Sequence, residues 1–277
     1  MARQGRLDGD RSSEETLSLF LLSSFNIRRN GQPVNGRLGG KSRQLLKVLA
    51  AHRHKCLPKD YLIEMIWPDV DPAAGATSLK VAAHNLRSVL DPDKKSGDPG
   101  NWIVVQEGTY RLNPHAAIWI DVEAFRAHYA RGVSLMAQQE HAEARRELER
   151  AEALYIGDYL EEDVYEDWTL ISREELRDLH LDVLCRLANV SAEEKDYHAL
   201  IQYSHKIILS DPCREDAYRM LIKAHASLNQ IGRAGSWYAI CRSTLAREVG
   251  SGPSPETVML FESLFPDISK PTDRRTA

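Results

Sequence analysis

Hydrophobic residues alternate with other residues at the start of the chain, which is typical of a half-buried strand. The alternation runs from Leu17 to Leu21 and continues as strand-like sequence through Ile27. Asn30-Gly31 follows, and because both residues tolerate positive φ, the pair predicts a tight turn. A short strand at Pro33-Val34 would complete a hairpin. The chain is therefore expected to open with β structure.

The spacing then changes to that of three amphipathic helices. The first follows Gly39-Gly40, the second has Pro58 near its first turn, and the third follows a loop over Asp69–Gly75. Trp67-Pro68 ends the second helix and Asp91-Pro92 ends the third. Hydrophobic residues at helical spacing give each helix one buried stripe. The stripes are Leu45, Leu46, Leu49 and Ala50 in the first helix, Leu62, Met65 and Ile66 in the second, and Leu79, Ala82 or Ala83, Leu86 and Leu90 in the third.

A second hairpin is predicted after these helices. A polar loop, Asp93–Gly100, leads to the apolar run Trp102–Val105, and Glu107-Gly108 form a turn before Tyr110–Leu112 returns. The order over residues 17–112 is a sheet, three helices and a hairpin. This is the layout of a winged helix-turn-helix with an additional N-terminal sheet.

From about Val122 the strand signals disappear and helical spacing continues. Turn residues interrupt it at Gly157, Asp211-Pro212, Gln230–Gly232 and Gly250–Pro255. The predicted helices cover Ala124–Met136, Ala142–Tyr155, Trp168–Ala188, Ala192–Ser210, Asp216–Asn229 and Arg233–Val249. Helix pairs separated by such turns predict a stack like tetratricopeptide repeats, in which each pair buries a face against the next. An irregular helical bundle is the alternative.

These patterns predict a mainly α protein with a small β component and two domains. We expect a flexible tail at 1–16, a winged helix-turn-helix domain at 17–114, a tetratricopeptide-like all-α repeat domain at 118–265 and a second flexible tail at 266–277. Charge divides the chain in a similar way. The net charge of −4 combines 17 Lys and Arg against 12 Asp and Glu in residues 1–113 with 19 against 28 in the remainder. A basic front half favours a nucleic-acid partner, although modest asymmetry of this kind is common.

Composition excludes several classes of protein. Hydrophobic residues make up 43% of the chain and charged residues 27%, as in ordinary globular proteins. No apolar run approaches the roughly 20 residues that span a bilayer, and no secretory signal is recognised. The four cysteines are scattered, which predicts neither a disulfide framework nor a zinc site. We therefore expect a cytoplasmic protein with no membrane partner.

Three signals of small-molecule chemistry are rejected. Gly36–Ser42 resembles a phosphate-binding loop, but that motif requires glycine at the position of Asn35. His52 and His54 lack a carboxylate partner pattern for a metal site. The acidic residues from Glu161 to Asp167 are most simply a solvated segment. The sequence therefore predicts no enzyme, no cofactor and no bound metal.

The third helix carries the candidate DNA-reading residues. With its leucine stripe buried, it presents Lys80, Val81, His84, Asn85 and Arg87 on the outside. In the major groove, Asn pairs with adenine, Lys or Arg reaches guanine or phosphate, and an apolar side chain contacts the thymine methyl group. A merely solvated helical face is the alternative for these residues.

Two further groups are placed to contact the DNA backbone. Lys41, Ser42 and Arg43 lie at the start of the first helix, where a helix N-terminus can hold a phosphate. Thr109 and Arg111 lie on the closing hairpin, where a wing would touch the backbone or the minor groove. Together with the third helix, these residues predict a winged-helix DNA interface.

Several segments together resemble a known family of regulators. Lys41–Leu90 with Trp67-Pro68, and the closing Gly108–Leu112, look like the OmpR/PhoB-type effector domain, and more narrowly like that of the Streptomyces antibiotic regulatory protein (SARP) family. The segments Asp121-Val122, Phe125, Gly157–Leu160, Trp168, Asp211–Glu215, Gly232-Arg233, Leu245–Gly250 and Pro253–Glu256 resemble the bacterial transcriptional activation domain that accompanies it. The resemblance covers residues 17–265.

The resemblance implies a transcription activator. Such proteins bind direct repeats near promoters as side-by-side protomers and recruit RNA polymerase holoenzyme, partly through its sigma factor, often to a secondary-metabolite gene cluster. It also implies that the loop with Trp67, Asp69 and Asp71 faces the polymerase. The chain has one arginine, Arg87, on its central recognition helix, where relatives often carry two or three. The alternative is a helical-repeat scaffold or a ligand-sensing interaction protein whose winged helix no longer reads DNA.

Overall fold

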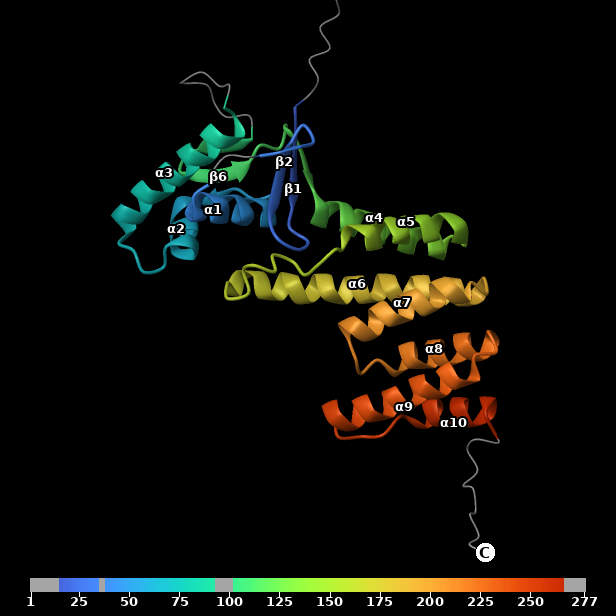
Figure 1. Cartoon of the computed structure of the whole chain (residues 1–277). Helices are drawn as coiled ribbons and strands as arrows, with labels where there is room; N and C mark the ends of the chain where they lie inside the picture. Colours follow the sequence, from blue (N-terminus) through green and yellow to red (C-terminus); the bar gives the residue numbers. More distant parts are fainter. Residues whose placement is uncertain (1–14, 35–37, 93–101, 267–277) are drawn as a thin grey trace, which may run out of the picture. The chain divides into compact units, whose positions relative to one another are not determined.

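The computed structural model describes residues 15–34, 38–92 and 102–266, and it divides the chain into two compact units (Figure 1). The first unit extends to Ala124 and includes Tyr159–Val164, whereas the second consists of Phe125–Asp158 and the residues from Tyr165 onward. The two expected tails lie outside the described residues except for 15–16 and 266. So do the polar loop Asp93–Gly100 and Asn35. The domain boundaries at 114 and 118 stay a prediction about independently folding parts.

A four-stranded sheet opens the first unit. Its strands are β1 (Thr16–Phe20), β2 (Asn26–Arg29), β3 (Gln32–Pro33) and β7 (Ala117–Ile120), in the order β3-β2-β1-β7. β1 pairs antiparallel with β2 and parallel with β7. The side chains of Leu17 and Leu19 are fully buried. The sheet therefore contributes one apolar face to the core.

The sequence pattern describes this sheet incompletely. The strand-like run from Leu17 to Ile27 forms two strands, because the chain reverses direction between Phe20 and Asn26. The turn at Asn30-Gly31 is confirmed, with φ of 51° and 77°, and it joins β2 to β3. The pattern did not predict β7, whose partner β1 lies far away in the sequence.

Three helices form the middle of the first unit: α1 (Gly40–Ala51), α2 (Lys59–Ile66) and α3 (Pro72–Leu90). Their predicted stripes are buried, except that Met65 is only half-buried. The start of α3 differs from the prediction, since the expected loop Asp69–Gly75 is already helical from Pro72. Asp71 caps this earlier start, because its Oδ1 accepts hydrogen bonds from the backbone N–H of Ala73 and of Ala74, at 2.9 and 3.3 Å.

A three-stranded sheet completes the winged helix. Its strands are β4 (Leu57–Pro58), β5 (Ile103–Gln106) and β6 (Thr109–Leu112), in the order β4-β6-β5. The predicted hairpin is confirmed, with Glu107 and Gly108 at φ of 51° and 75° in its turn. The sequence pattern did not predict β4, which consists of two residues and pairs with β6. We call β5, β6 and their turn the wing.

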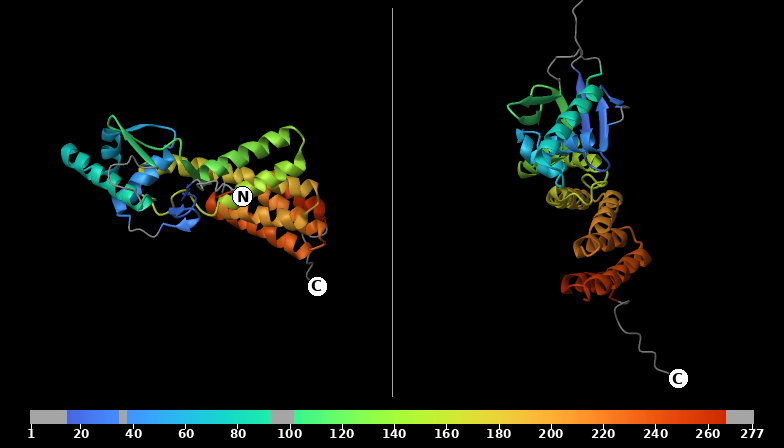
Figure 2. Two further views of the ribbon diagram at one scale, coloured as in Figure 1. Left: turned by 90° about the horizontal axis from the view of Figure 1, so that it is seen from above. Right: turned by 90° about the vertical axis from the view of Figure 1, so that its left-hand side faces the viewer.

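The described chain after β7 holds seven helices. They are α4 (Asp121–Ala137), α5 (His141–Leu154), α6 (Asp167–Glu193), α7 (Tyr197–Ser210), α8 (Glu215–Ser227), α9 (Ile231–Glu248) and α10 (Pro255–Leu264). Each helix from α5 to α9 packs on the next, and α10 packs on α8 (Figure 2). The prediction of stacked helical repeats is therefore confirmed. No helix in the described part of the chain is long and apolar enough to cross a membrane.

Two features of the helices in this half were not predicted. The expected helix Ala192–Ser210 is divided between the end of α6 and α7, because the chain turns at Lys195, where φ is 59°. α10 follows the expected turn at Gly250–Pro255 and was not predicted. Glu215 holds its start, since the carboxylate accepts hydrogen bonds from the backbone N–H and the hydroxyl of Ser254, at 2.9 and 2.8 Å.

The segment between α5 and α6 folds partly with the first unit. We call Tyr159–Val164 the acidic strap, because it contains Glu161, Glu162 and Asp163. Tyr159 forms a β-bridge with Leu22, and the backbone N–H of Leu160 donates to the carbonyl oxygen of Leu21 at 2.8 Å. The first unit therefore contains two separate parts of the chain that no local pattern connects.

Candidate nucleic-acid interface

α3 presents a polar stripe to solvent. Lys80, Val81, His84 and Asn85 are all exposed, and 54% of Val81 is accessible. Their spacing places them on one face of the helix, opposite the buried residues. The buried residues are Gly75, Leu79, Ala82, Ala83, Leu86 and Leu90. A helix of this kind fits the major groove of DNA, where amide, amine and methyl groups distinguish base pairs.

An open groove of about 430 Å³ lies beside this stripe. Its walls are the first turn of α1, the side chain of Trp67 and the side of α3 that carries Val81 and Asn85. α1 begins at Gly40 with no side-chain cap and no acidic residue in its first turn. The first N–H groups of a helix have no acceptor within it and carry the positive end of its dipole. The groove therefore offers hydrogen-bond donors to a phosphate next to the stripe.

The three residues predicted to contact the DNA backbone are placed differently. Lys41 is exposed, and its Nζ donates to the carbonyl oxygen of Ile66 at 2.5 Å while lying 5.8 Å from the ring centroid of Trp67. Ser42 also lines the groove but is only 3% exposed. Arg43 turns away and donates to the carbonyl oxygen of Phe25. Of the three, Lys41 is the residue whose charged side chain borders the groove.

Arg87 is placed differently from the other four predicted reading residues. It is half-buried, and its Nη2 donates to the carbonyl oxygen of Ile103 on β5 at 3.4 Å. Burial raises the pKa of Tyr110 on β6, and the positive charge of Arg87 opposes that rise. The side chain of Arg87 therefore lies against the wing instead of on the exposed stripe.

Both predicted wing residues lie on the outer face of the wing. The hydroxyl of Thr109 donates to the carbonyl oxygen of Gln106 at 2.7 Å and so closes the turn. Arg111 is half-buried and lies opposite Val104 on β5. Because successive residues of a strand point to opposite faces, Arg111 shares its face with Thr109, while Tyr110 and Leu112 point to the core.

The loop assigned to the polymerase is shorter than predicted. Trp67 is only 9% exposed and Asp71 caps α3, so both side chains anchor the loop. Asp69 is exposed, and Val70 beside it is 39% exposed. The outward part of the loop therefore consists of Pro68, Asp69 and Val70.

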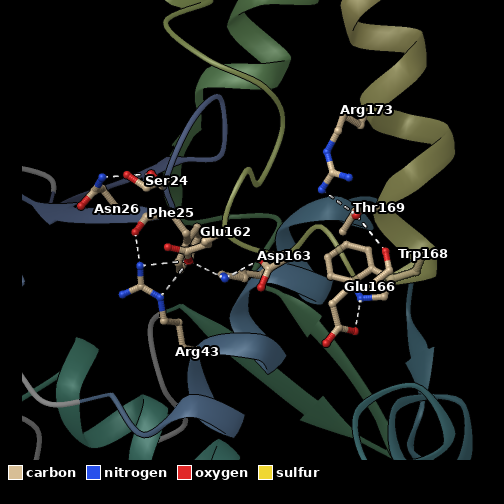
Figure 3. Close-up of polar contacts among 11 residues, drawn as sticks. Ser24, Phe25, Asn26, Arg43, Glu162, Asp163, Glu166, Trp168, Thr169 and Arg173 are labelled. Carbon is tan, nitrogen blue, oxygen red and sulfur yellow. Dashed lines mark hydrogen bonds and ion pairs between the residues drawn. The ribbon is translucent and has the colours of Figure 1, made fainter.

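A charge cluster that the sequence patterns did not indicate holds the acidic strap on α1. Lys47 is 4% exposed, and its Nζ lies 2.6 Å from a carboxylate oxygen of Glu162 and 2.5 Å from one of Asp163. Arg43 lies 3.3 Å from Glu162 and also contacts Phe25 (Figure 3). Burial alone would raise the pKa of Glu162, but the hydrogen bond and the charge of Lys47 outweigh burial and lower it. The interpretation of this acidic run as simply solvated is therefore wrong for Asp163, whereas Glu162 is exposed and pairs with α1 at the same time.

The rejected metal site can be examined in the described residues. His54 lies 3.3 Å from Glu123, and Arg53 lies 3.5 Å from the same carboxylate oxygen. Across 15–34, 38–92 and 102–266, no group of three or more His, Cys, Asp and Glu side chains is arranged to hold a metal ion. His54 is therefore part of a surface charge group that also contains an arginine.

Comparison with known families agrees with this arrangement. Residues 120–265 match the bacterial transcriptional activator domain, and residues 31–111 match the family described as transcriptional regulatory protein, C terminal. The first match covers more than half of the chain. The chain belongs to the SARP-like transcriptional regulators. The resemblance drawn from the sequence is thereby confirmed.

Individual relatives of this SARP-like regulator are also transcriptional regulators. The transcriptional regulatory protein EmbR of Mycobacterium tuberculosis is 25% identical over 260 residues, which are 93% of this chain and 65% of EmbR. MoaR1 of the same organism is 24% identical over 263 residues, which are 95% of this chain and 83% of MoaR1. The structure of Mycobacterium tuberculosis EmbR in complex with a low affinity phosphopeptide superposes with a TM-score of 0.72 at 23% identity, covering 94% of this chain and 67% of that one. This structural likeness shows that the two proteins share a fold.

Proposed function

We propose that this SARP-like regulator is a sequence-specific DNA-binding transcription activator that places α3 in the major groove. The observation that carries the proposal is the exposed stripe of Lys80, Val81, His84 and Asn85 beside an open groove. The stripe offers a cation, an apolar contact, an imidazole and an amide within one face of a helix, which are the groups that read base edges. Neither Glu nor Asp interrupts it.

A phosphate of the DNA backbone fits the groove beside the stripe. The first-turn N–H groups of α1 and the Nζ of Lys41 lie on its α1 wall. Lys41 is exposed and its Nζ donates to the carbonyl oxygen of Ile66 at the edge of the groove, so a small movement of the side chain would bring it to a phosphate there. Phosphate contacts of this kind set the register of a protein on the duplex, while base contacts select the sequence.

The promoter context of the proposal rests on the family. We expect side-by-side protomers on direct repeats, and recruitment of RNA polymerase holoenzyme with its sigma factor through the loop Pro68–Val70. The acidic Asp69 at the outward part of that loop suits a basic surface of the polymerase. The corresponding role is that of a cytoplasmic protein that activates a secondary-metabolite gene cluster.

Selection from a random duplex library tests the DNA-binding part. The purified chain is incubated with the library, bound duplexes are amplified over several rounds, and affinity for the enriched duplex is titrated by fluorescence anisotropy. We expect a single enriched sequence family and a Kd that weakens steeply with salt, because released counterions drive phosphate binding. Enrichment of no sequence by a folded protein would favour the scaffold alternative.

Two substitutions and a matched control locate the interface. Asn85→Ala is expected to weaken binding to the enriched duplex by about 1–3 kcal/mol and to relax the preference at one base pair. If Lys80 contacts a phosphate, Lys80→Ala is expected to weaken binding to all duplexes equally. If Lys80 contacts a guanine, the substitution is expected to weaken binding only to duplexes that carry that guanine. Lys223→Ala removes the same charge from the exposed surface of α8 and should leave affinity unchanged. Equal effects of Lys80→Ala and Lys223→Ala would contradict the assignment of α3.

A further inference from the structure

We infer that Arg87 is a positioning residue that fixes the wing against α3, and that it does not itself read bases. The inference rests on the proposed DNA-binding function and concerns how that site is assembled. α3 and the wing would then enter adjacent grooves of the duplex as one rigid body. The single arginine of the recognition helix would act on DNA through Thr109 and Arg111.

The contacts of Arg87 point away from the reading stripe. Its Nη2 donates to the carbonyl oxygen of Ile103, and Ile103 itself is 1% exposed. The Nε of Arg87 is also buried, and it has no hydrogen-bond partner within the described ranges. Burial of the side chain therefore extends inward from Nη2 to Nε. Val81, at the centre of the stripe, is by contrast 54% exposed. A side chain enclosed in this way reaches a base edge only if it first leaves the wing.

The wing also contacts the other two helices, because β6 packs on α1 and the backbone N–H of Lys59 at the start of α2 donates to the carbonyl oxygen of Gly108 at 2.9 Å. It joins the rest of its sheet through β4, which contributes the two pairs Leu57 with Tyr110 and Pro58 with Thr109. Arg87 contacts the other strand, β5, at the position whose partner on β6 is Leu112. Contacts with β4, α1 and α2 therefore hold β6 and the turn, whereas Arg87 links α3 to β5.

Arginine suits this role for a physical reason. Its planar guanidinium carries five N–H donors in a fixed geometry, so a terminal nitrogen can bond the carbonyl oxygen of Ile103 while the rest of the side chain stays half-buried. A methionine of similar length would keep the packing and lose the hydrogen bond, which makes Arg87→Met the informative change.

The first test measures the wing in the free protein. Hydrogen exchange of the full chain is followed by mass spectrometry or NMR, with and without Arg87→Met. We expect amides of β5 and β6 to exchange at least about fivefold faster in the variant, while those of α1 and α2 keep their rates, because local opening responds to local contacts. Asn85→Ala, two positions earlier and exposed, is the control and should leave every rate unchanged. Unchanged exchange of the wing in Arg87→Met would overturn the inference.

The second test is a double-mutant cycle on DNA affinity. Arg87→Met is combined with the wing variant Thr109→Ala/Arg111→Ala, and each protein is titrated with the duplex enriched by the wild-type chain. We expect Arg87→Met alone to weaken binding about tenfold and to weaken it little further once the wing contacts are gone, because both changes remove the same interaction. Additive losses would mean that Arg87 touches DNA directly, and a wing variant with wild-type affinity would mean that the wing does not bind. Either result overturns the inference.

The cycle separates this inference from the proposed function. Failure of the wild-type chain to bind any selected duplex would refute the proposed function, and the exchange experiment would still report on the wing. Arg87→Lys keeps the positive charge on a single donor nitrogen. Its exchange rates and DNA affinity should lie between those of the wild-type chain and Arg87→Met. If Arg87→Met does not fold, as judged by circular dichroism, Arg87→Lys takes its place in both tests.

Discussion

At the residue scale, a single buried carboxylate joins distant parts of the first unit. Asp121 is 2% exposed, and its oxygens accept hydrogen bonds from the backbone N–H groups of Leu21, Leu22 and Val122, each at 2.8 Å. Leu21 and Leu22 directly follow β1, where the chain leaves the sheet. Burial raises the pKa of Asp121, and these N–H groups partly counteract the rise. Buried backbone donors without an acceptor are costly, so Asp121 satisfies groups that the sheet leaves open.

Replacement of Asp121 by alanine should therefore destabilise the protein. The change leaves the buried N–H groups of Leu21 and Leu22 and the partly buried one of Val122 without this acceptor, and we expect the free energy of unfolding to fall by about 2–3 kcal/mol. Urea denaturation at pH 7, followed by circular dichroism, measures it. Asp178→Ala removes an exposed carboxylate from α6 and is the matched control, with an expected change within about 0.5 kcal/mol. Similar losses in the two variants would show that the hydrogen bonds accepted by Asp121 contribute nothing specific to stability.

At the element scale, the acidic strap and α1 depend on each other. Lys47 is buried with the carboxylates of Glu162 and Asp163 as its ion-pair partners. Removing both negative charges with Glu162→Gln/Asp163→Asn leaves a buried ammonium group without a counter-charge. Because the two carboxylates are themselves partly exposed, we expect a loss of about 2 kcal/mol, below the range for a fully buried pair. Thermal unfolding measures it, with Glu161→Gln as a control that keeps the hydrogen bond to Ser23.

The same strap should make stability depend on pH. The pKa of Glu162 is lowered in the folded protein, so its ionised form stabilises the fold. That contribution is complete above the ordinary glutamate pKa of about 4.3 and is lost as the pH falls through the lower pKa of the folded state. Unfolding curves from pH 7 to pH 3 should therefore show a smaller loss of stability for Glu162→Gln than for the wild-type chain. Parallel curves would contradict the lowered pKa.

The close packing of α2 on α3 predicts that two glycine-to-alanine substitutions change the stability of the protein in opposite directions. A Cβ on Gly75 would lie 2.5 Å from Cγ2 of Ile63, whereas a Cβ on Gly235 in α9 would meet nothing within 4 Å. Gly75→Ala should therefore destabilise the protein by about 1–3 kcal/mol through overpacking. Gly235→Ala should stabilise it by about 0.5–1 kcal/mol, because alanine loses less backbone entropy in a helix. The melting temperatures of the two variants should move in opposite directions, and a shared direction would refute the packing argument.

Local signals predicted most helices and both hairpin turns, and long-range contacts account for most of what was missed. Asp71-Pro72 is a capping signal that would have placed the start of α3 correctly, but the glycine at position 75 favoured a longer loop. β7 alternates in burial yet pairs with β1 across almost the whole first unit, and no periodicity reveals such a partner. Arg87 lies at the edge of the exposed arc of α3, so helical spacing alone could not show that it turns to the wing.

At the scale of the whole molecule, the chain passes between its two units three times. It crosses after Ala124, after Asp158 and after Val164. The consequence is that β7, Asp121 and the acidic strap all follow the predicted boundary at residue 114, although they fold with the residues before it. A fragment that ends at that boundary lacks β7, the parallel partner of β1. It also lacks Asp121, which accepts the hydrogen bond from Leu21, and both ion-pair partners of Lys47.

Fragments of different length should therefore differ in stability in a definite order. We expect residues 15–114 to be the least stable fragment, and residues 15–124 to be more stable because β7 and Asp121 return. Lys47→Met in the 15–124 fragment should have little effect, since that fragment lacks the strap and with it both ion-pair partners of Lys47. The same substitution in the full chain should destabilise the protein, because there it removes the ion pairs of Lys47 with Glu162 and Asp163.

Thermal unfolding of the three fragments, of the full chain and of its Lys47→Met variant checks this order, and a loss of stability for Lys47→Met in the full chain alone is the decisive result. Equal stability of the 15–114 and 15–124 fragments would show that β7 and Asp121 are dispensable for the winged helix. The outcome also decides how a DNA-binding test of the front half must be designed. If the order holds, the absence of DNA binding by a fragment ending near 114 does not separate loss of the fold from loss of DNA contacts, and the 15–124 fragment is the one whose binding is informative.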